Sequence, residues 1–180
     1  MIGVVLTNRT AADRSAVDFY ATPDNVTEAL LLFLGLPQST VIWECAAGQG
    51  HMARVLERHG HSVIATDLET DFLTCSPRGD MMVTNPPFSL AGEFIKRAIQ
   101  NHMPFALLLK SQYWHAEKRR ALFFKHRPQY VLPLTWRPDF HFGKKGGAPT
   151  MECLWTVWGA EPATVTQYLP LAKPGRKEKV

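Results

Sequence analysis

The strongest constraint on the fold is an alternation of short apolar segments with segments of helical periodicity. Residues 105–109 are the most apolar of these segments, as expected for a strand in the middle of a sheet covered on both faces. This alternation favours a mostly parallel α/β sheet with helices on both faces. Strands are predicted at 41–43, 62–66, 81–84, 105–109, 129–134 and 153–158, with helices at 51–59, before His102 and at 115–126.

The first helix is predicted from a Thr-Pro pair. Thr22 is expected to cap the helix with its hydroxyl, and Pro23 is expected at the first helical position, where a missing N–H costs nothing. Val26, Ala29, Leu30 and Phe33 follow at helical spacing, and the helix is expected to end at Gly35 and Pro37.

The composition indicates one domain. The chain has 180 residues and 46% apolar content, enough for a core. We expect a flexible lead-in over 1–17, a single catalytic domain over 18–160 without a separate target-recognition domain, and a C-terminal tail over 161–180 that is disordered from 173. Three dispersed cysteines and no signal-like start indicate a reduced, cytoplasmic protein, and no apolar stretch is long enough for a membrane span.

Charge is divided unevenly along the chain. Residues 1–90 carry a balance of −5 and residues 91–180 a balance of +9, within a net charge of +4. Such a division suits a chain that binds a small cofactor with one half and a polyanion with the other, although a solvated basic surface gives the same pattern.

A glycine-containing turn, Glu44-Cys45-Ala46-Ala47-Gly48-Gln49-Gly50, follows the first predicted strand and opens a helix. Small residues let the backbone approach a ligand, and the helix N-terminus offers N–H groups. The next strand ends at Asp67, an acid suited to the hydroxyls of a ribose. The phosphate-binding pattern GxxxxGK[ST] is absent, which favours a ligand without phosphate.

The segment Asn85-Pro86-Pro87-Phe88 ends another apolar strand. Proline cannot continue a ladder, so nearby carbonyls become acceptors. The Asn85 side-chain oxygen and the Pro86 carbonyl could hold both hydrogens of a planar, delocalised amine, and Phe88 could stack on its ring. Orientation against an electrophile would supply much of the catalysis without a metal.

These motifs resemble those of amino-group DNA methyltransferases, particularly the short phage and prophage adenine-N6 enzymes, over about residues 18–158. The resemblance implies a Rossmann-like methyltransferase sheet with an antiparallel last strand and a shortened region around the third strand, because only 17 residues separate Asp67 from Asn85. It implies S-adenosylmethionine as cofactor, transfer to adenine N6 in DNA with little sequence specificity, and a bacterial or phage-infected host cell. The aromatic residue of the tetrapeptide is usually Tyr, and Phe88 keeps the ring without the hydroxyl.

The resemblance also implies the site residues. The catalytic tetrapeptide corresponds to Asn85, Pro86, Pro87 and Phe88. The cofactor contacts correspond to Tyr20, Thr22, Pro23, Glu44, Ala46, Gly48, Gly50, Asp67, Leu68, Asp71, Phe72 and Asn85. No metal is implied, and His51 and His115 lack the spacing of metal ligands.

The target amine must be flipped out of a duplex or presented on a single strand, so the chain needs phosphate and base contacts. Candidates are Lys118, Arg119, Arg120, Arg137, Lys144 and Lys145 for phosphates, with Trp114 and Trp136 stacking on bases. Lys110 is a further cation in this region.

Several alternatives stay open at the level of sequence. Similar tetrapeptides occur in enzymes that methylate RNA bases or protein glutamine, and a non-catalytic nucleic-acid-binding module could keep the fold. The target sequence, the choice between duplex and single strand, and the oligomeric state are also open.

Overall fold

Seven strands pair into one sheet in the computed structural model, which describes residues 21–140 and 148–175. The order across the sheet is β2-β1-β3-β4-β6-β5-β7, and β6 runs antiparallel to both of its neighbours. The strands are β1 (Val41–Glu44), β2 (Ser62–Ala65), β3 (Met81–Thr84), β4 (Phe105–Lys110), β5 (Tyr130–Pro133), β6 (Cys153–Trp158) and β7 (Gln167–Tyr168). The expected α/β sheet, mostly parallel and with residues 153–158 antiparallel, is confirmed.

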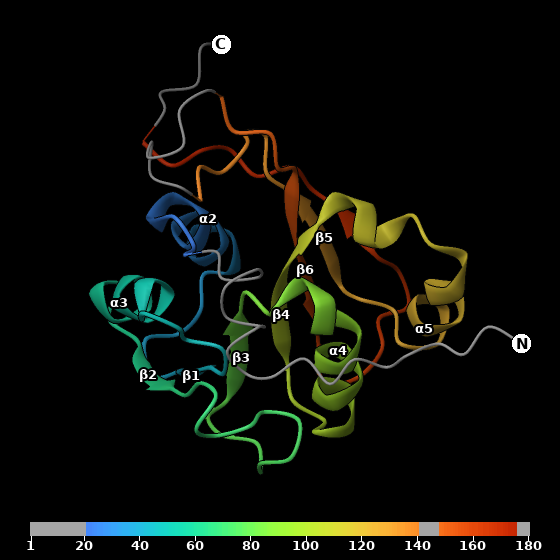
Figure 1. The fold of residues 1–180 in the computed structure, drawn as a ribbon, viewed down its shortest axis with the longest axis horizontal. Coiled ribbons are helices and arrows are strands. Elements are labelled where there is room, and N and C mark those ends of the chain that lie inside the picture. Colours follow the sequence, from blue (N-terminus) through green and yellow to red (C-terminus); the bar gives the residue numbers. More distant parts are fainter. Residues whose placement is uncertain (1–20, 141–147, 176–180) are drawn as a thin grey trace, which may run out of the picture.

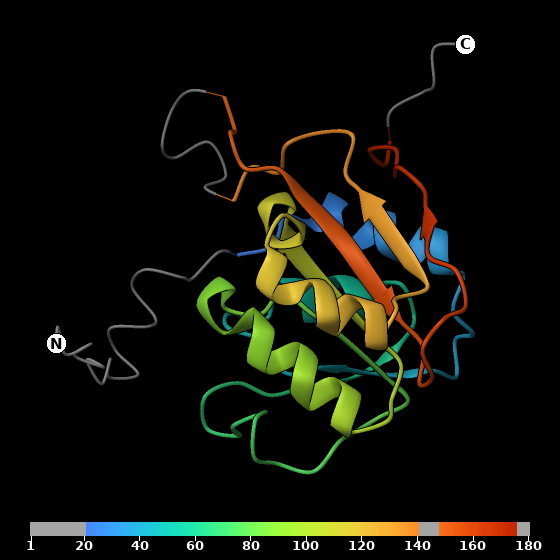
Figure 2. The ribbon, with the colours of Figure 1, turned by 90° about the vertical axis from the view of Figure 1, so that its right-hand side faces the viewer.

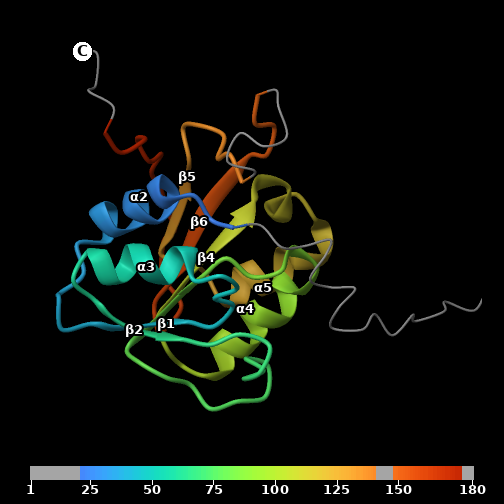
Figure 3. The same ribbon diagram turned by 60° about the vertical axis from the view of Figure 1, so that its left-hand side comes forward.

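Helices cover both faces of the sheet. α2 (Asp24–Leu34) and α3 (His51–Arg58) lie on one face, and α4 (Ala91–Gln100) and α5 (Arg120–Lys125) lie on the other (Figure 1). Figure 2 brings the α4–α5 face forward, and Figure 3 brings α2 and α3 forward. The buried side chains accordingly form two clusters, with Leu108 on the α2–α3 side and Leu107 on the α4 side. Alternation along β4 therefore supplies both cores.

The start of α2 differs from its prediction. Pro23 is itself the N-cap residue, and no side chain caps the helix. The Thr22 hydroxyl instead accepts a hydrogen bond from Asn85 Nδ2 at 3.1 Å. The expected capping role of Thr22 is wrong, because its hydroxyl bonds to Asn85 and not to an N–H group of α2. Trp155 of β6 also binds this helix, because its Nε1 donates a hydrogen bond to the Val26 carbonyl at 3.0 Å.

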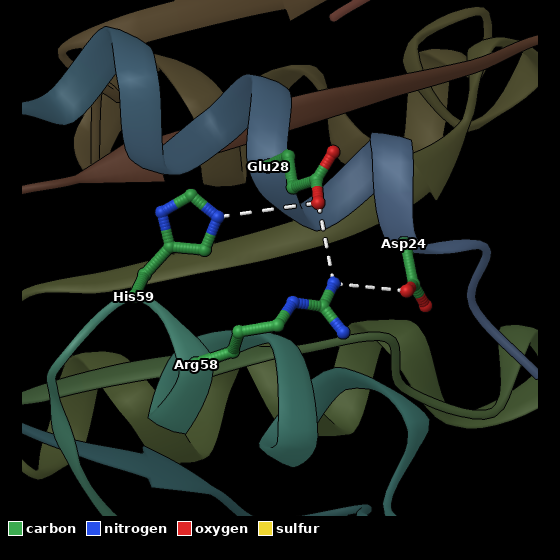
Figure 4. A network of polar contacts seen from close by, with 4 residues as sticks. All are labelled: Asp24, Glu28, Arg58 and His59. Carbon is green, nitrogen blue, oxygen red and sulfur yellow. Dashed lines mark hydrogen bonds and ion pairs between the residues drawn. The ribbon is translucent and has the colours of Figure 1, made fainter.

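An ion-pair cluster joins α2 to α3 on the outer surface (Figure 4). Arg58 Nη2 lies 2.9 Å from Asp24 Oδ2 and 3.2 Å from Glu28 Oε1, and His59 Nε2 lies 4.0 Å from the same Glu28 oxygen. These side chains are largely exposed, so their pairing adds little stability. The cluster orients the two helices whose N-terminal ends flank the candidate site.

The chain between β2 and β3 contains turns but no helix or strand, and β2 is an edge of the sheet among the described residues. The expected shortening around the third strand is therefore present. Gly79 (φ 69°) lies so close to β1 that a Cβ there would stand 2.7 Å from the Val41 carbonyl oxygen. Asp80 exchanges hydrogen bonds of 2.8 Å with the Val41 backbone, which fixes where β3 begins beside β1.

Two C-terminal features differ from their predictions. The expected basic helix over 115–126 is a 3-10 turn, Glu117–Arg119, followed by the short α5. The segment placed in a tail from 161 adds β7 to the sheet, parallel to β5, and Leu171 is buried. The expectations for 1–17 and for the last residues, 176–180, lie outside the described residues.

Candidate functional site at the carboxyl ends of β1, β2 and β3

Three neighbouring parallel strands bring the predicted motifs to one edge of the sheet. Glu44 ends β1, Asp67 follows β2 after one residue, and Asn85 directly follows β3. The strands are neighbours in the order β2-β1-β3, so Asp67 and Asn85 lie about two strand spacings apart, roughly 10 Å. The carboxyl edge of an open α/β sheet is where ligands bind, and these motifs meet there.

The turn after β1 depends on two left-handed glycines. Gly48 has φ 52° and Gly50 has φ 72°, a region that side chains with a Cβ disfavour. Gly50 is the N-cap of α3, its N–H donates to the Ala47 carbonyl at 2.8 Å, and its carbonyl accepts from Arg54 N–H at 3.0 Å. The Ala47 N–H donates to the Thr66 carbonyl, so the turn is tied to the end of β2. The backbone at Gly48 can therefore approach a ligand beside Asp67.

Glu44 is a buried carboxyl, 1% exposed, at the base of this turn. Its Oε1 accepts hydrogen bonds from the Thr84 hydroxyl and from the Ala46 N–H at 3.3 Å. Burial raises the pKa of Glu44 to about 7, the hydrogen bonds from Thr84 and Ala46 oppose this shift, and the nearby Asp67 adds to it. Thr84 precedes Asn85, so Glu44 connects the glycine turn to the tetrapeptide.

Asp67 is half-buried at the end of β2, with its carboxylate near the N–H groups of Gly48 and Leu68. Burial raises its pKa and the charge of Glu69 adds to the shift, whereas the two backbone hydrogen bonds lower it. Leu68 is exposed on the same loop. Asp67 and Glu69 make this part of the edge acidic.

Asp71 and Phe72, on the loop after β2, both have local partners. Asp71 Oδ1 accepts from the Leu73 N–H at 3.0 Å, so this exposed carboxylate closes a local turn. Phe72 is 2% exposed and packs at 5.3 Å from the Trp43 ring and 4.7 Å from the Phe94 ring. Its ring belongs to the core beneath the loop, and its predicted contact with a cofactor stays a prediction.

The tetrapeptide directly follows β3. Its last residue, Phe88, begins a 3-10 turn (Phe88–Leu90), and α4 follows this turn. Pro86 is buried, and Asn85, Pro87 and Phe88 are half-buried. The hydrogen bond to Thr22 fixes the amide nitrogen of Asn85 and hence the direction in which its oxygen faces. Lys110 Nζ lies 4.2 Å from the centre of the Phe88 ring, a cation–π contact from the end of β4.

An open groove of about 980 Å³ includes in its wall Ser111, the residue that follows Lys110. It runs past the carboxyl end of β5, and its wall includes Trp114, His115, Trp136, Arg137, Glu152 and Tyr168. A second groove of about 540 Å³ shares Trp114, His115 and Thr166 with the first and continues along α5. The structure thus brings together Trp114, Trp136 and Arg137, three of the predicted nucleic-acid contacts.

Cations predicted for phosphates lie in several settings. Lys118 and Arg120 are exposed, and Arg120 lines the second groove. Arg119 packs its guanidinium 3.8 Å from the centre of the Tyr113 ring and donates to the Tyr113 carbonyl, so it supports the local fold. Arg137 pairs with Glu152 at 2.8 Å on the surface. Lys144, Lys145 and the predicted cofactor contact Tyr20 lie outside the described residues.

Some residues of this edge were not predicted. Thr84 donates a hydrogen bond to Glu44, and the charge of Glu69 acts on Asp67. Their positions in the sequence, close to Asn85 and Asp67, are the signal that could have identified them. Tyr168, Phe124 and Arg127 line the grooves, but Tyr168 belongs to a segment without periodicity and gave no signal.

Within 21–140 and 148–175, no three His, Cys, Asp or Glu side chains gather as a metal site. A search of the same residues finds no helix with the length and apolar character needed to cross a membrane.

Comparisons with known proteins identify the fold. No protein-family model and no curated protein sequence matches the chain. A structure assigned as the modification subunit of a type I restriction enzyme from Vibrio vulnificus superposes with a TM-score of 0.59 at 13% identity, over 93% of this chain and 51% of that one. This chain thus spans about half the length of that subunit.

Two further structures have similar scores. One, assigned as a class I S-adenosylmethionine-dependent methyltransferase from Listeria monocytogenes, gives a TM-score of 0.56 at 12% identity, over 86% of this chain and 67% of that one. The other, assigned as an RNA methyltransferase from Pyrococcus horikoshii, gives 0.55 at 14% identity, over 82% and 88%. At these identities the likeness shows the fold, which is the Rossmann-like fold of methyltransferases.

Proposed function

We propose that the chain is an S-adenosylmethionine-dependent methyltransferase that acts on the exocyclic N6 amine of adenine in DNA. The observation that carries the proposal is the placement of Asn85-Pro86-Pro87-Phe88 on β3, beside the glycine turn of β1 and the acid that follows β2. The methyltransferase fold and the names of its structural neighbours support this proposal.

The residues around the glycine turn fit this cofactor. Asp67 offers a carboxylate for ribose hydroxyls, and the left-handed Gly48 and Gly50 allow close approach of the backbone. Asp67 and Glu69 make the edge acidic, which favours a cationic ligand and disfavours one with phosphates. Phe72 packs beneath the loop. The contacts proposed for the cofactor are Pro23, Glu44, Ala46, Gly48, Gly50, Asp67, Leu68 and Asp71, and Thr22 is proposed to hold the Asn85 amide.

When bound, the cofactor supplies an electrophilic methyl group on a sulfonium. The protein's part is to hold the amine. The Asn85 oxygen and the Pro86 carbonyl accept the two amine hydrogens, which turns the nitrogen lone pair toward the methyl group. Phe88 stacks on the base, and Lys110 must then leave that ring if the base takes the same face. Amides cannot retain a proton, so the proton that the amine loses passes to water.

The test is methyl transfer from labelled cofactor to DNA, with digestion to nucleosides and mass analysis. We expect N6-methyladenine, and we expect Asn85→Ala to lower the rate about 100-fold or more while DNA and cofactor binding persist. Asn101→Ala is the matched control, because Asn101 caps the far end of α4. RNA and protein extracts form parallel arms. Label that enters only RNA or protein, or an Asn85→Ala variant with full activity, would contradict the proposal.

A further inference from the structure

The two grooves share Trp114, His115 and Thr166 and thus form one continuous track. Ser111, which lines the first groove, directly follows Lys110, the lysine that lies over Phe88. The first is bordered by β5, β6 and the β7 segment, and the second by α5. Figure 2 shows α5 and β7 beside the β5–β6 strands that separate them. The track thus leads away from the tetrapeptide toward the β7 edge of the sheet.

Exposed aromatic rings line this track. Phe124 in the second groove is 73% exposed, and Tyr168 in the first is 66% exposed. Trp114 and Trp136 contribute half-buried indoles to the first groove, and Trp114 stacks on Phe123 at 4.0 Å. Scattered exposed side chains are ordinary, whereas exposed rings that gather in adjoining grooves are a feature of binding surfaces. Their flat faces are suited to stacking with other rings.

The track carries a small excess of positive charge, because Arg137 in the first groove pairs with Glu152 and the second groove holds two arginines and one acid, Glu117. The segment 110–127 contains six Lys or Arg residues and one Glu. Arg120 and Arg127 line the second groove, and the Arg127 guanidinium lies 5.7 Å from the centre of the Phe124 ring. Rings and cations in one groove combine base stacking with phosphate contacts.

We infer that this track binds unpaired, single-stranded DNA on one side of the target adenine. The inference rests on the proposed methyl transfer, because Lys110, which contacts the Phe88 ring of the tetrapeptide, is followed directly by Ser111 in the wall of the track. Bases in a duplex stack on one another, so a duplex would leave Phe124 and Tyr168 without ring partners. An unpaired strand offers base faces to these rings, and it presents the adenine amine without the cost of flipping.

The experiment measures fluorescence anisotropy of labelled oligonucleotides of one sequence, as single strand, duplex and RNA, with no cofactor added. We expect the single-stranded DNA to bind most tightly. Tyr168→Ala and Phe124→Ala should each weaken it about fivefold or more. Leu32→Ala is the matched control, since Leu32 is 69% exposed on α2, on the other face of the sheet.

A charge variant tests the phosphate contacts. Arg120→Gln should reduce the slope of log affinity against log salt concentration by about one, the contribution of one phosphate contact. Arg78→Gln, on the exposed loop before β3, should leave this slope unchanged. Equal or tighter binding of duplex or RNA would overturn the inference, as would unchanged affinity of both aromatic variants.

Sedimentation of the same variants tests a different occupant. If Tyr168→Ala and Phe124→Ala dissociate a dimer and leave DNA binding unchanged, the face is an interface between copies of this chain and the inference is wrong. Single-strand binding through the track, without any methyl transfer, would support the track and count against the proposed reaction alone.

Discussion

Glu44 makes the stability of the protein depend on pH. Its pKa is about 7 in the folded protein, above the ordinary value of 4.5, so the folded state holds a proton that the unfolded chain releases. The stabilisation from this proton is complete below about pH 4.5 and is lost as pH rises to about 7. The full change is about 3 kcal/mol at most, because one pKa unit corresponds to about 1.4 kcal/mol.

Glu44→Gln tests this dependence, since glutamine keeps an acceptor for Thr84 and Ala46 but does not titrate. The free energy of unfolding of the variant, minus that of the wild type, should rise between pH 5 and pH 7 and then level off. Urea denaturation at a series of pH values measures it. A difference that stays constant over this range would show that Glu44 is ionised throughout.

Thr22 is predicted to act through Asn85. Thr22→Val removes the acceptor of the Asn85 amide, so the amide loses its fixed orientation and the methyl-transfer rate should fall roughly tenfold to a hundredfold. Cofactor affinity, measured by calorimetry, should change little, and Thr22→Ser should restore the rate. If Thr22→Val weakened cofactor binding and kept the rate at saturation, Thr22 would be a cofactor contact instead.

At the level of elements, the segment after residue 160 is held to β5 by a row of backbone hydrogen bonds. The N–H groups of Gln167, Leu169 and Leu171 donate to carbonyls of residues 129, 131 and 133 at 2.8, 3.1 and 2.8 Å. Leu171 is 6% exposed and packs in the α2-side core, whereas Leu169 is 39% exposed. This segment therefore belongs to the folded unit.

Leu171→Ala should lower the free energy of unfolding by about 2–5 kcal/mol, the usual cost of emptying a buried leucine site. Leu169→Ala is the control from the same segment, and its smaller buried surface predicts a smaller loss. Chemical denaturation of both variants provides the measurement. Equal, small losses would mean that the segment is not part of the cooperative core.

The sequence predicted the elements whose signal is local. Short apolar runs identified β1 to β6, and the prolines of the tetrapeptide marked the end of β3. The role of Thr22 could not be predicted, because its partner Asn85 lies 63 residues away. β7 pairs through its backbone and exposes both of its side chains, so it has no apolar periodicity. The sequence places Phe72 in a loop, so its burial could not be predicted. It is buried because the chain after β2 folds back over Trp43 and Phe94.

At the scale of the whole molecule, the order of the strands separates the two parts of the candidate site. The acid and the glycine turn lie at β2 and β1, the tetrapeptide lies at β3, and the grooves lie beyond β4 at β5 to β7. The acidic first half of the sequence supplies β1 to β3, and the basic second half supplies β4 to β7. The charge division along the chain thus becomes a division across the sheet.

The position of β2 at the rim of the sheet has a kinetic consequence. The chain between β2 and β3 is reduced to turns, and the edge near Asp67 and the track lie toward opposite flanks of the sheet. In the proposed reaction, cofactor and strand would therefore approach the tetrapeptide from different sides. Exchange of the cofactor would then not require release of the strand, which would allow repeated modification of one DNA molecule.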